Sequence, residues 1–178
     1  MICELAQMNR LVLWVAQGFG LGRIPIMPGT FGSLLGFGWL WLLLCGGRLW
    51  IFVLGMIFGF ALSVWLCGAA EKLLQKKDPS SVVLDEVTAF PLCYLLWVGK
   101  FWSAHHALPG MNLFFGKQSW YWTVGVFVLF RVFDIVKPWP IRASQSLAAG
   151  WGVTVDDFLA AFFVLALTAI FSSLASPF

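Results

Sequence analysis

Two adjacent carboxylates, Asp85 and Glu86, lie in the stretch VVLDEVTAF, at the start of an apolar run that continues to Val98. Acidic side chains cost up to about 2.5–3.5 kcal/mol each at the centre of a bilayer, so those in apolar segments commonly serve a function. The chain has six other acids, which are Glu4, Glu71, Asp78, Asp134, Asp156 and Asp157. Carboxylates that gather in one place repel one another unless a cation lies between them. The acids therefore indicate a metal site if the fold brings them together.

A site built only from carboxylates suits a hard divalent ion, magnesium or manganese, rather than zinc. The two histidines, His105 and His106, are expected in a loop away from the acids and are interpreted as ordinary loop residues. The four cysteines stand singly in apolar surroundings, which is typical of packing thiols. We therefore expect no zinc site and no disulfide.

Basic residues accompany one of the acids in the stretch FRVFDIVKPWP, residues 130–140. Arg131, Asp134 and Lys137 follow at i, i+3 and i+6, so they share roughly one helical face before Pro138 breaks the helix. Two cations beside a metal-binding carboxylate suit an anionic phosphate group. The alternative is that both cations only neutralise Asp134 and reach toward lipid headgroups.

The elements that must position these residues are membrane helices. Hydrophobic residues make up 61% of the 178 residues and charged residues 11%, against about 45–50% and about 25% in a soluble domain. The length allows one domain, residues 1–178, with its core built by packing spans against each other. A formal net charge of +3 is too small to indicate a nucleic-acid partner.

Five apolar segments are long enough to be considered as spans. They run over residues 31–47, 49–70, 82–99, 120–136 and 153–175. Only Arg48 separates the first two, which predicts a tight helical hairpin. Residues 1–18 have the pattern of an amphipathic helix on the membrane surface. The predicted fold is all-α: a polytopic membrane helical bundle with four to five transmembrane helices and an N-terminal amphipathic helix.

Lys and Arg residues orient this bundle, because cytoplasmic loops are enriched in them. With a cytoplasmic N-terminus, seven fall on the cytoplasmic side and three on the other. The seven are Arg10, Arg23, Lys72, Lys76, Lys77, Lys137 and Arg142, and the three are Arg48, Lys100 and Lys117. The acids of three spans then lie at one depth, near the cytoplasmic ends, and we expect them to form a shared interior cluster.

The stretch PIMPGTFGS, residues 25–33, ends a glycine-rich segment and begins a span. Thr30 is a candidate N-cap, and the free N–H groups of the first helical turn form a potential phosphate cradle. Gly18, Gly20 and Gly22, in the preceding glycine-rich segment, lack the strand before them that a dinucleotide-binding motif requires, so they are interpreted as turn-forming residues.

Four stretches in order, PGTFGS, DPSSVVLDE, FRVFDIVKPWPI and GWGVTVDDFLA, resemble the phosphatidylglycerophosphatase A family. The resemblance covers about residues 17–162. It implies a multi-pass enzyme of the bacterial inner membrane, with its site on the cytoplasmic side. The implied reaction is magnesium-dependent hydrolysis of the terminal phosphate monoester of phosphatidylglycerol phosphate, which gives phosphatidylglycerol and inorganic phosphate. The residues that it supports are Pro28, Gly29, Thr30, Gly32, Ser33, Asp78, Asp85, Glu86, Arg131, Asp134, Lys137, Asp156 and Asp157.

Specific roles follow as a hypothesis. Asp85, Glu86, Asp134 and Asp156 are the expected magnesium ligands, with Asp157 supporting them either by binding the metal directly or by contacting its ligands. Arg131, Lys137, Thr30 and Ser33 are expected to bind the substrate phosphate. Metal-assisted attack by water is expected, with Asp78 as a candidate base; direct attack by a carboxylate stays open.

Three other functions are alternatives. A phosphatase for another lipid phosphate monoester differs least from this hypothesis. A small cation transporter would also place carboxylates in the membrane, but here they gather at one end of the spans and none lies at the midplane. A purely structural membrane protein would use its charges only for internal pairing.

Overall fold

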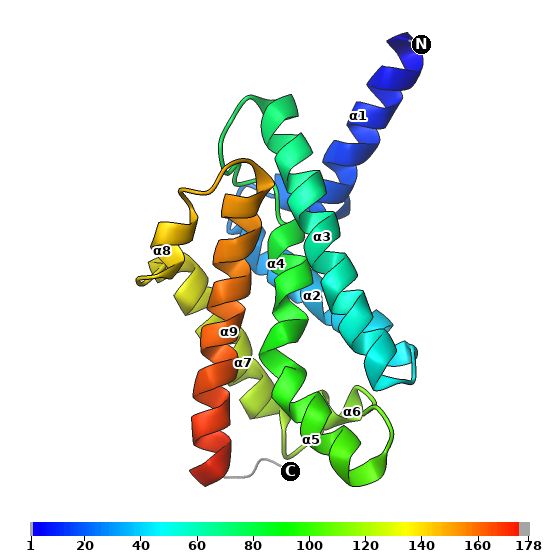
Figure 1. The fold of residues 1–178 in the computed structure, drawn as a ribbon, viewed down its shortest axis with the longest axis vertical. Helices are drawn as coiled ribbons and strands as arrows, with labels where there is room; N and C mark the ends of the chain where they lie inside the picture. The colour runs from blue at the N-terminus through cyan, green and yellow to red at the C-terminus, as the bar shows by residue number, and fades with distance from the viewer. Residues whose placement is uncertain (1, 175–178) are drawn as a thin grey trace.

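All regular elements of the described chain, residues 2–174, are helices in the computed structural model (Figure 1). The α-helices are α1 (Ile2–Ala16), α2 (Pro28–Cys45), α3 (Leu49–Leu74), α4 (Leu84–Ala89), α5 (Leu95–His105), α6 (Asn112–Phe115), α7 (Trp120–Val136), α8 (Ile141–Ser144) and α9 (Gly150–Leu174). Two 3₁₀ helices, η1 (Gly18–Arg23) and η2 (Phe90–Tyr94), connect some of them. The prediction of an all-α fold is confirmed.

Three helices are long and apolar enough to cross a membrane: α2, α3 and the part of α9 from Gly150 to Phe171. Their bounds agree closely with the first, second and fifth predicted segments, although Ala175 lies outside the described residues. The predicted tight connection is present, because residues 46–48 alone join α2 to α3. Helix α7 has the bounds predicted for the fourth segment, and its 17 residues are near the lower limit for a span. The predicted number of four to five spans therefore exceeds the three that length and composition identify.

The third predicted segment, residues 82–99, is not one regular α-helix. It divides into α4, η2 and α5, and α5 continues to His105. Pro91 lies at the start of η2 and provides the reason, because proline lacks the N–H of an interior helical bond and clashes with the preceding turn. The break leaves α4 as a six-residue helix whose side chains are all buried.

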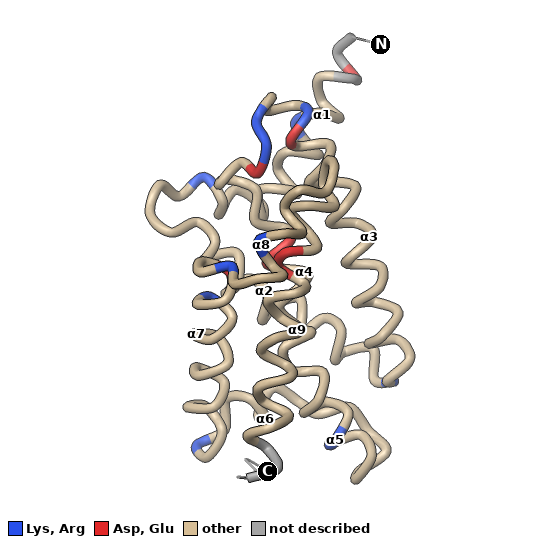
Figure 2. Tube along the Cα trace, turned by 60° about the vertical axis from the view of Figure 1, so that its left-hand side comes forward, with Lys and Arg blue, Asp and Glu red and all other residues tan. Residues whose placement is uncertain are grey.

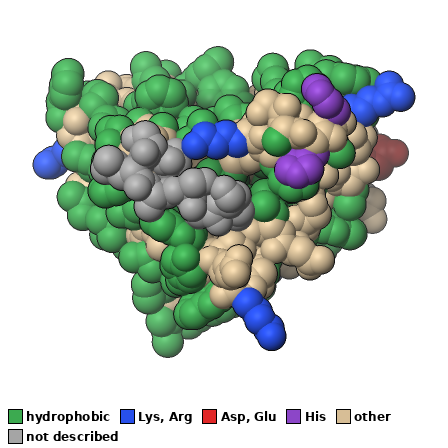
Figure 3. Space-filling view, turned by 90° about the horizontal axis from the view of Figure 1, so that it is seen from below, with side chains coloured by type: hydrophobic (Ala, Val, Ile, Leu, Met, Phe, Trp, Pro, Cys, Tyr) green, Lys and Arg blue, Asp and Glu red, His purple; other side chains and the backbone are tan. Residues whose placement is uncertain are grey.

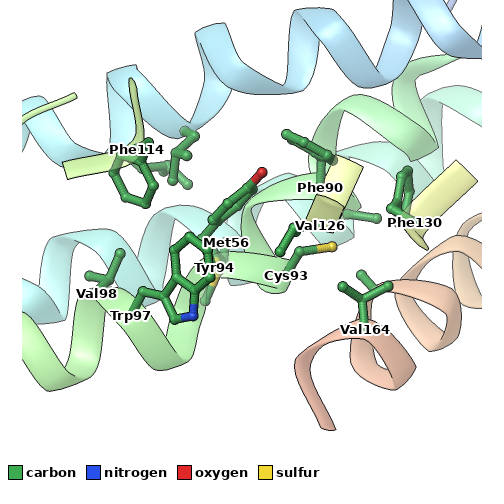
Figure 4. Close-up of a cluster of buried hydrophobic side chains, with 14 of the residues drawn as sticks. Met56, Phe90, Cys93, Tyr94, Trp97, Val98, Phe114, Val126, Phe130 and Val164 are labelled. Atoms are coloured by element: carbon green, nitrogen blue, oxygen red, sulfur yellow. The ribbon is translucent and has the colours of Figure 1, made fainter. Parts of the chain in front are cut away.

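An aromatic core fixes η2 against α5, α6 and α7 (Figure 4). Phe90, Tyr94, Phe114 and Phe130 are fully buried, and the ring of Tyr94 meets those of Phe90 and Phe114 edge to face. The Tyr94 hydroxyl donates a hydrogen bond to the carbonyl of Thr123 on α7, at 3.2 Å. Because α4 directly precedes η2 in the chain, this core also fixes the position of α4.

Small and hydroxyl-bearing residues bring α3 and α9 together. A Cβ on Gly150 would lie 2.0 Å from the carbonyl oxygen of Val64 and 2.5 Å from the nitrogen of Gly68, so only glycine permits this approach. Deeper in the contact, the hydroxyls of Ser63 and Thr154 lie 3.0 Å apart. Close approach through small residues is typical of packed membrane helices, and it determines where the first turns of α9 lie.

Helix α1 contacts the rest of the protein through its C-terminal end. Ala16 is buried against Cys67 and Ala70 of α3, and its carbonyl accepts a hydrogen bond from the N–H of Val83, at 3.0 Å. The remainder of α1 points away from the bundle, with Met8 and Leu11 exposed (Figure 1). The predicted N-terminal helix is confirmed, and its place on a membrane surface stays a prediction.

The two ends of the bundle differ in charge. Most of the Lys and Arg residues, together with the acids, lie in the half that contains the loop after α3 (Figure 2). The opposite end carries the α2–α3 turn, α5 and α6, and its surface shows the two histidines among hydrophobic and scattered basic side chains (Figure 3). The histidines therefore lie away from the acids, as predicted.

Candidate active site

All the acids predicted to be catalytic line one cavity of about 330 Å³, together with both predicted phosphate-binding cations. The cavity lies where the start of α2, the segment before α4, the end of α7 and the start of α9 meet. The predicted residues in its wall are Asp78, Asp85, Glu86, Arg131, Asp134, Lys137, Asp156 and Asp157. Convergence of acids from three segments was predicted from their common depth, and it is confirmed.

The tightest carboxylate group consists of Glu86, Asp134 and Asp157. One oxygen from each of these side chains lies within 4.8 Å of the other two. Oε2 of Glu86 is buried and accepts no hydrogen bond from the described residues, and Asp157 is 3% exposed. Three carboxylates at this spacing form a donor set for a hard divalent cation, and the oxygen without a donor leaves room for one more bond.

Arg131 lies beside this group and contacts α2, α4 and its own helix. Its Nη1 is 3.0 Å from Oε1 of Glu86, 2.7 Å from Oδ2 of Asp134 and 3.2 Å from the Ser33 hydroxyl. Its Nε is also buried but has no acceptor among the described residues. Because a guanidinium carries five donors in a planar fork, Arg131 can hold the carboxylates and still donate to a ligand.

A second set of contacts holds Asp156, on the far side of the cavity. Oδ2 of Asp156 accepts hydrogen bonds from Nζ of Lys137 at 2.6 Å and from Nε2 of Gln145 at 3.1 Å. Burial alone would lower the pKa of Lys137, but the hydrogen bond and the charge of Asp156 outweigh it, so this pKa lies above its ordinary value. The ammonium group therefore stays charged, and it lies 3.9 Å from Asp134.

Asp85 and Asp78 complete the acidic wall. Asp85 is 4% exposed and stands in the first turn of α4, where its Oδ1 accepts the N–H of Glu86. Asp78 is exposed and belongs to the segment between α3 and α4. Its N–H donates to Oε1 of Glu71, at 2.9 Å, which fixes the backbone at the outer edge of the cavity.

The start of α2 forms the part of the wall that lies against Glu86 and Arg131. A Cβ on Gly29 would lie 2.0 Å from Oε1 of Glu86 and 2.7 Å from Nη2 of Arg131. A Cβ on Gly32 would lie 2.3 Å from Oε2 of Glu86. The two glycines therefore let α2 approach the carboxylate and the guanidinium directly.

Two predictions for this stretch need correction or refinement. Thr30 was predicted as the N-cap of α2, but the cap is Met27, because Pro28 begins the helix and provides its first turn. The cavity wall includes Pro28 and Gly29 but, among the described residues, neither Thr30 nor Ser33. Ser33 is fully buried behind Arg131 and donates to the carbonyl of Gly29, at 2.9 Å.

Comparisons with known proteins show to which family the chain belongs. The sequence profile of the family described as phosphatidylglycerophosphatase A matches residues 14–172. The chain belongs to this family. A phosphatidylglycerophosphatase A of Escherichia coli is 33% identical over 147 residues, which cover 82% of this chain and 74% of the relative. One of Haemophilus influenzae is 36% identical over 154 residues, covering 85% and 82%.

A third relative, from Bacteroides thetaiotaomicron, is provisionally named a phosphatidylinositol-3-phosphatase. It is 34% identical over 166 residues, which cover 90% of this chain and 92% of the relative. No solved structure matches the chain significantly. Each of the four stretches that carry the likeness to the phosphatidylglycerophosphatase A family supplies residues to the cavity wall: Gly29, Asp85, Arg131 and Asp156 are one from each.

Sequence reasoning missed several residues of this family member's cavity. Gln145 lies behind the wall of this cavity, where it holds Asp156, and it stands in a polar stretch with no spacing that relates it to an acid. Met27 and Ile135 line the cavity. Their hydrophobic side chains gave no signal, because apolar residues at these positions are equally expected to face lipid.

Proposed function

We propose that this chain is a phosphatidylglycerophosphatase that removes the terminal phosphate monoester of phosphatidylglycerol phosphate. The observation that carries the proposal is the convergence of Glu86, Asp134 and Asp157 with Arg131 and Lys137 in one cavity. The printed names of the two phosphatidylglycerophosphatase A relatives support this substrate. Membership of the family and the apolar helices support a location in the bacterial inner membrane.

Magnesium fits the residues of the cavity. Glu86, Asp134 and Asp157 would hold it, with Asp85 and Asp156 beside them. Of the two roles open to Asp157, this arrangement favours the direct ligand. The free Oε2 of Glu86 and the absence of sulfur or imidazole donors in the described wall favour a hard cation. When bound, magnesium supplies positive charge to the phosphoryl oxygens and makes water more acidic.

The chain's own groups supply the other requirements of phosphate-ester hydrolysis. Arg131 donates to the phosphate through Nε, while its Nη1 stays bonded to Glu86 and Asp134. Lys137, held by Asp156, adds a second positive charge, and Ser33 acts through Arg131. Asp78, at the exposed edge, accepts the proton of the attacking water. The bond between phosphorus and the glycerol oxygen then breaks, the leaving alkoxide takes up a proton from water, and Asp78 returns its proton to water, so that the products are the lipid alcohol and inorganic phosphate.

The proposed topology has five crossings, in which α7 and the interrupted segment from α4 to α5 join the three long helices. The fold supports this arrangement, because α7 and the segment from α4 to α5 both pack against α9 and run alongside it (Figure 1). The excess of basic residues at the cavity end favours a cytoplasmic active site.

Phosphate release by the detergent-purified protein tests the proposed function. Phosphatidylglycerol phosphate is the substrate, with magnesium or with a chelator in its place. We expect release that depends on magnesium and falls by about 100-fold in Asp85→Asn. Glu4→Gln, which removes a negative charge on α1 outside the cavity, serves as the matched control and keeps full activity. No release by the folded protein with magnesium would overturn the proposal.

A second candidate function is dephosphorylation of another lipid phosphate monoester, and the provisional name of the Bacteroides relative favours it. Parallel assays with phosphatidylinositol 3-phosphate and phosphatidic acid distinguish the two. Phosphatidylglycerol phosphate should give the highest kcat/KM. A higher value for either competitor would establish the second candidate instead.

A further inference from the structure

The catalytic cavity has one apolar edge, formed by Met27 before α2 and Ile135 near the end of α7. These two side chains lie near each other in the fold. Gly29 lies against the guanidinium of Arg131, and Ile135 follows Arg131 by four residues, which places both on one face of α7. The last turn of α7 therefore lies beside the start of α2.

Both side chains of this edge are exposed on the outside of the bundle, and both also line the cavity. Met27 is 59% exposed and Ile135 is 63% exposed. Ile26, Val136 and Trp139, their neighbours in sequence, are exposed too. A hydrophobic surface thus continues from the outside of the bundle to the wall that holds Arg131 and Glu86. Tryptophan is frequent at the level of lipid headgroups, which suits Trp139 beside this edge.

The backbone at Met27 adds a second observation. Its φ of 51° is in the left-handed region, which glycine adopts more readily than any other residue. Met27 therefore adopts a less favourable backbone conformation than a glycine would have there. Its long flexible side chain lies at the edge of the cavity. Such strain is common where a side chain serves a ligand.

The other side of the cavity is polar. A second cavity of about 270 Å³ adjoins it there, shares Asp78 and Val153 with it, and is also lined by Lys77 and Gln145. The catalytic cavity therefore has exposed apolar side chains at Met27 and Ile135 and adjoins a largely polar cavity at Asp78, while Val82 and Val153 contribute smaller apolar side chains to its wall. A lipid phosphate has the same division, with acyl chains at one end and an anionic phosphate at the other.

We infer that the substrate enters from the bilayer between Met27 and Ile135, with its diacylglycerol part against this edge and its terminal phosphate at Arg131. The inference rests on the proposed function and assigns its lipid-recognition site. The polar side, at Lys77 and Gln145, then leads the released phosphate to water.

Kinetic measurements with two substrates test whether the lipid enters the cavity between Met27 and Ile135. One is dioleoyl phosphatidylglycerol phosphate at fixed mole fraction in detergent micelles, and the other is its water-soluble analogue without acyl chains. The variants are Met27→Ser and Ile135→Ser. We expect the ratio of kcat/KM, long-chain over chain-free, to fall about tenfold in both variants, because apolar contact with the chains is lost.

Val132→Ser is the matched control, since Val132 is exposed on the same helix but does not line the cavity. Its ratio should stay at that of the unaltered protein. If the ratio of kcat/KM is the same in all three variants, entry of the substrate between Met27 and Ile135 is refuted, but the phosphatase activity is not. Absence of phosphate release from either substrate by the unaltered protein would instead reject the function on which the inference rests.

Photocrosslinking of the unaltered protein gives a result that does not depend on the folding of a variant. A phosphatidylglycerol phosphate with a diazirine near its acyl ester is irradiated in vesicles, beside phosphatidylcholine with the same group. We expect adducts at residues 26–28 and 135–139 that are specific to the phosphatidylglycerol phosphate probe. Specific adducts only on other segments would contradict the entrance.

Discussion

Arg131 connects the predicted motifs at the level of single residues. One guanidinium nitrogen contacts Glu86 from α4, Asp134 from α7 and Ser33 from α2. Its Nε remains available, because no described residue accepts from it. The alternative in which Arg131 only neutralises Asp134 does not account for this buried free donor, since an unpaired buried polar group costs about 1–3 kcal/mol.

Arg131→Lys tests this role. A lysine keeps the positive charge but has one ammonium group, which cannot bond both carboxylates and still present a directed donor to phosphate. We expect kcat/KM for phosphatidylglycerol phosphate to fall by about 100-fold or more. Arg142→Lys, at an exposed position of α8, makes the same change outside the cavity and should retain full activity. Equal activity of the two variants would contradict the role of Arg131.

Close contact between α2 and α4 is the decisive feature at the level of elements. α4 is only six residues long, is held by the aromatic core through η2, and presents Glu86 to the first turn of α2. Gly29 and Gly32 leave the space that Glu86 occupies. The two helices are therefore a rigid support for the carboxylate group rather than independent spans.

Gly29→Ala should disrupt the site through this contact. The added methyl group would overlap with Glu86 and Arg131, and a displacement of about 1 Å in an active site can cost about 100-fold in rate. Gly38→Ala on the same helix is the control, because its nearest neighbour would be Cδ1 of Leu35 at 3.9 Å. It should keep full activity and add about 0.5–1 kcal/mol to the free energy of unfolding. Phosphate release and thermal unfolding measure both effects, and an active Gly29→Ala enzyme would refute the close-contact role.

The sequence permitted a good prediction of these elements but not of their contacts. Hydropathy located the three long apolar helices, and the common depth of the acids predicted their convergence. The break at Pro91 was missed, because the whole segment is apolar and its hydropathy is the same with or without a break. The pairing of Asp156 with Lys137 and Gln145 depends on how α7, α8 and α9 pack, which no local spacing encodes. The same holds for Ser33 behind Arg131.

The whole molecule combines an asymmetric charge distribution with a cavity near one end. Lys72 lies in the last turn of α3 and Lys76 and Lys77 in the loop after it, next to the cavities. Arg48, Lys100 and Lys117 belong to the α2–α3 turn, to α5 and to the segment after α6, which lie at the opposite end, and Figure 2 shows basic side chains at both ends. Lys and Arg near span ends set orientation because they are retained on the cytoplasmic side. The cavity should therefore face the cytoplasm, where a substrate phosphate and free magnesium are both accessible.

Cysteine labelling from one side of the membrane tests this orientation. In a variant with Cys3 and the exposed Cys45 replaced by serine, Lys76→Cys should resist a membrane-impermeant thiol reagent in intact spheroplasts and react after lysis. Lys117→Cys should react in both conditions, because it lies at the other end of the bundle. Lys76 is suitable because it is exposed and lines neither cavity. The opposite labelling pattern would reverse the topology and place the released phosphate outside the cytoplasm, which the excess of basic residues at the cavity end argues against.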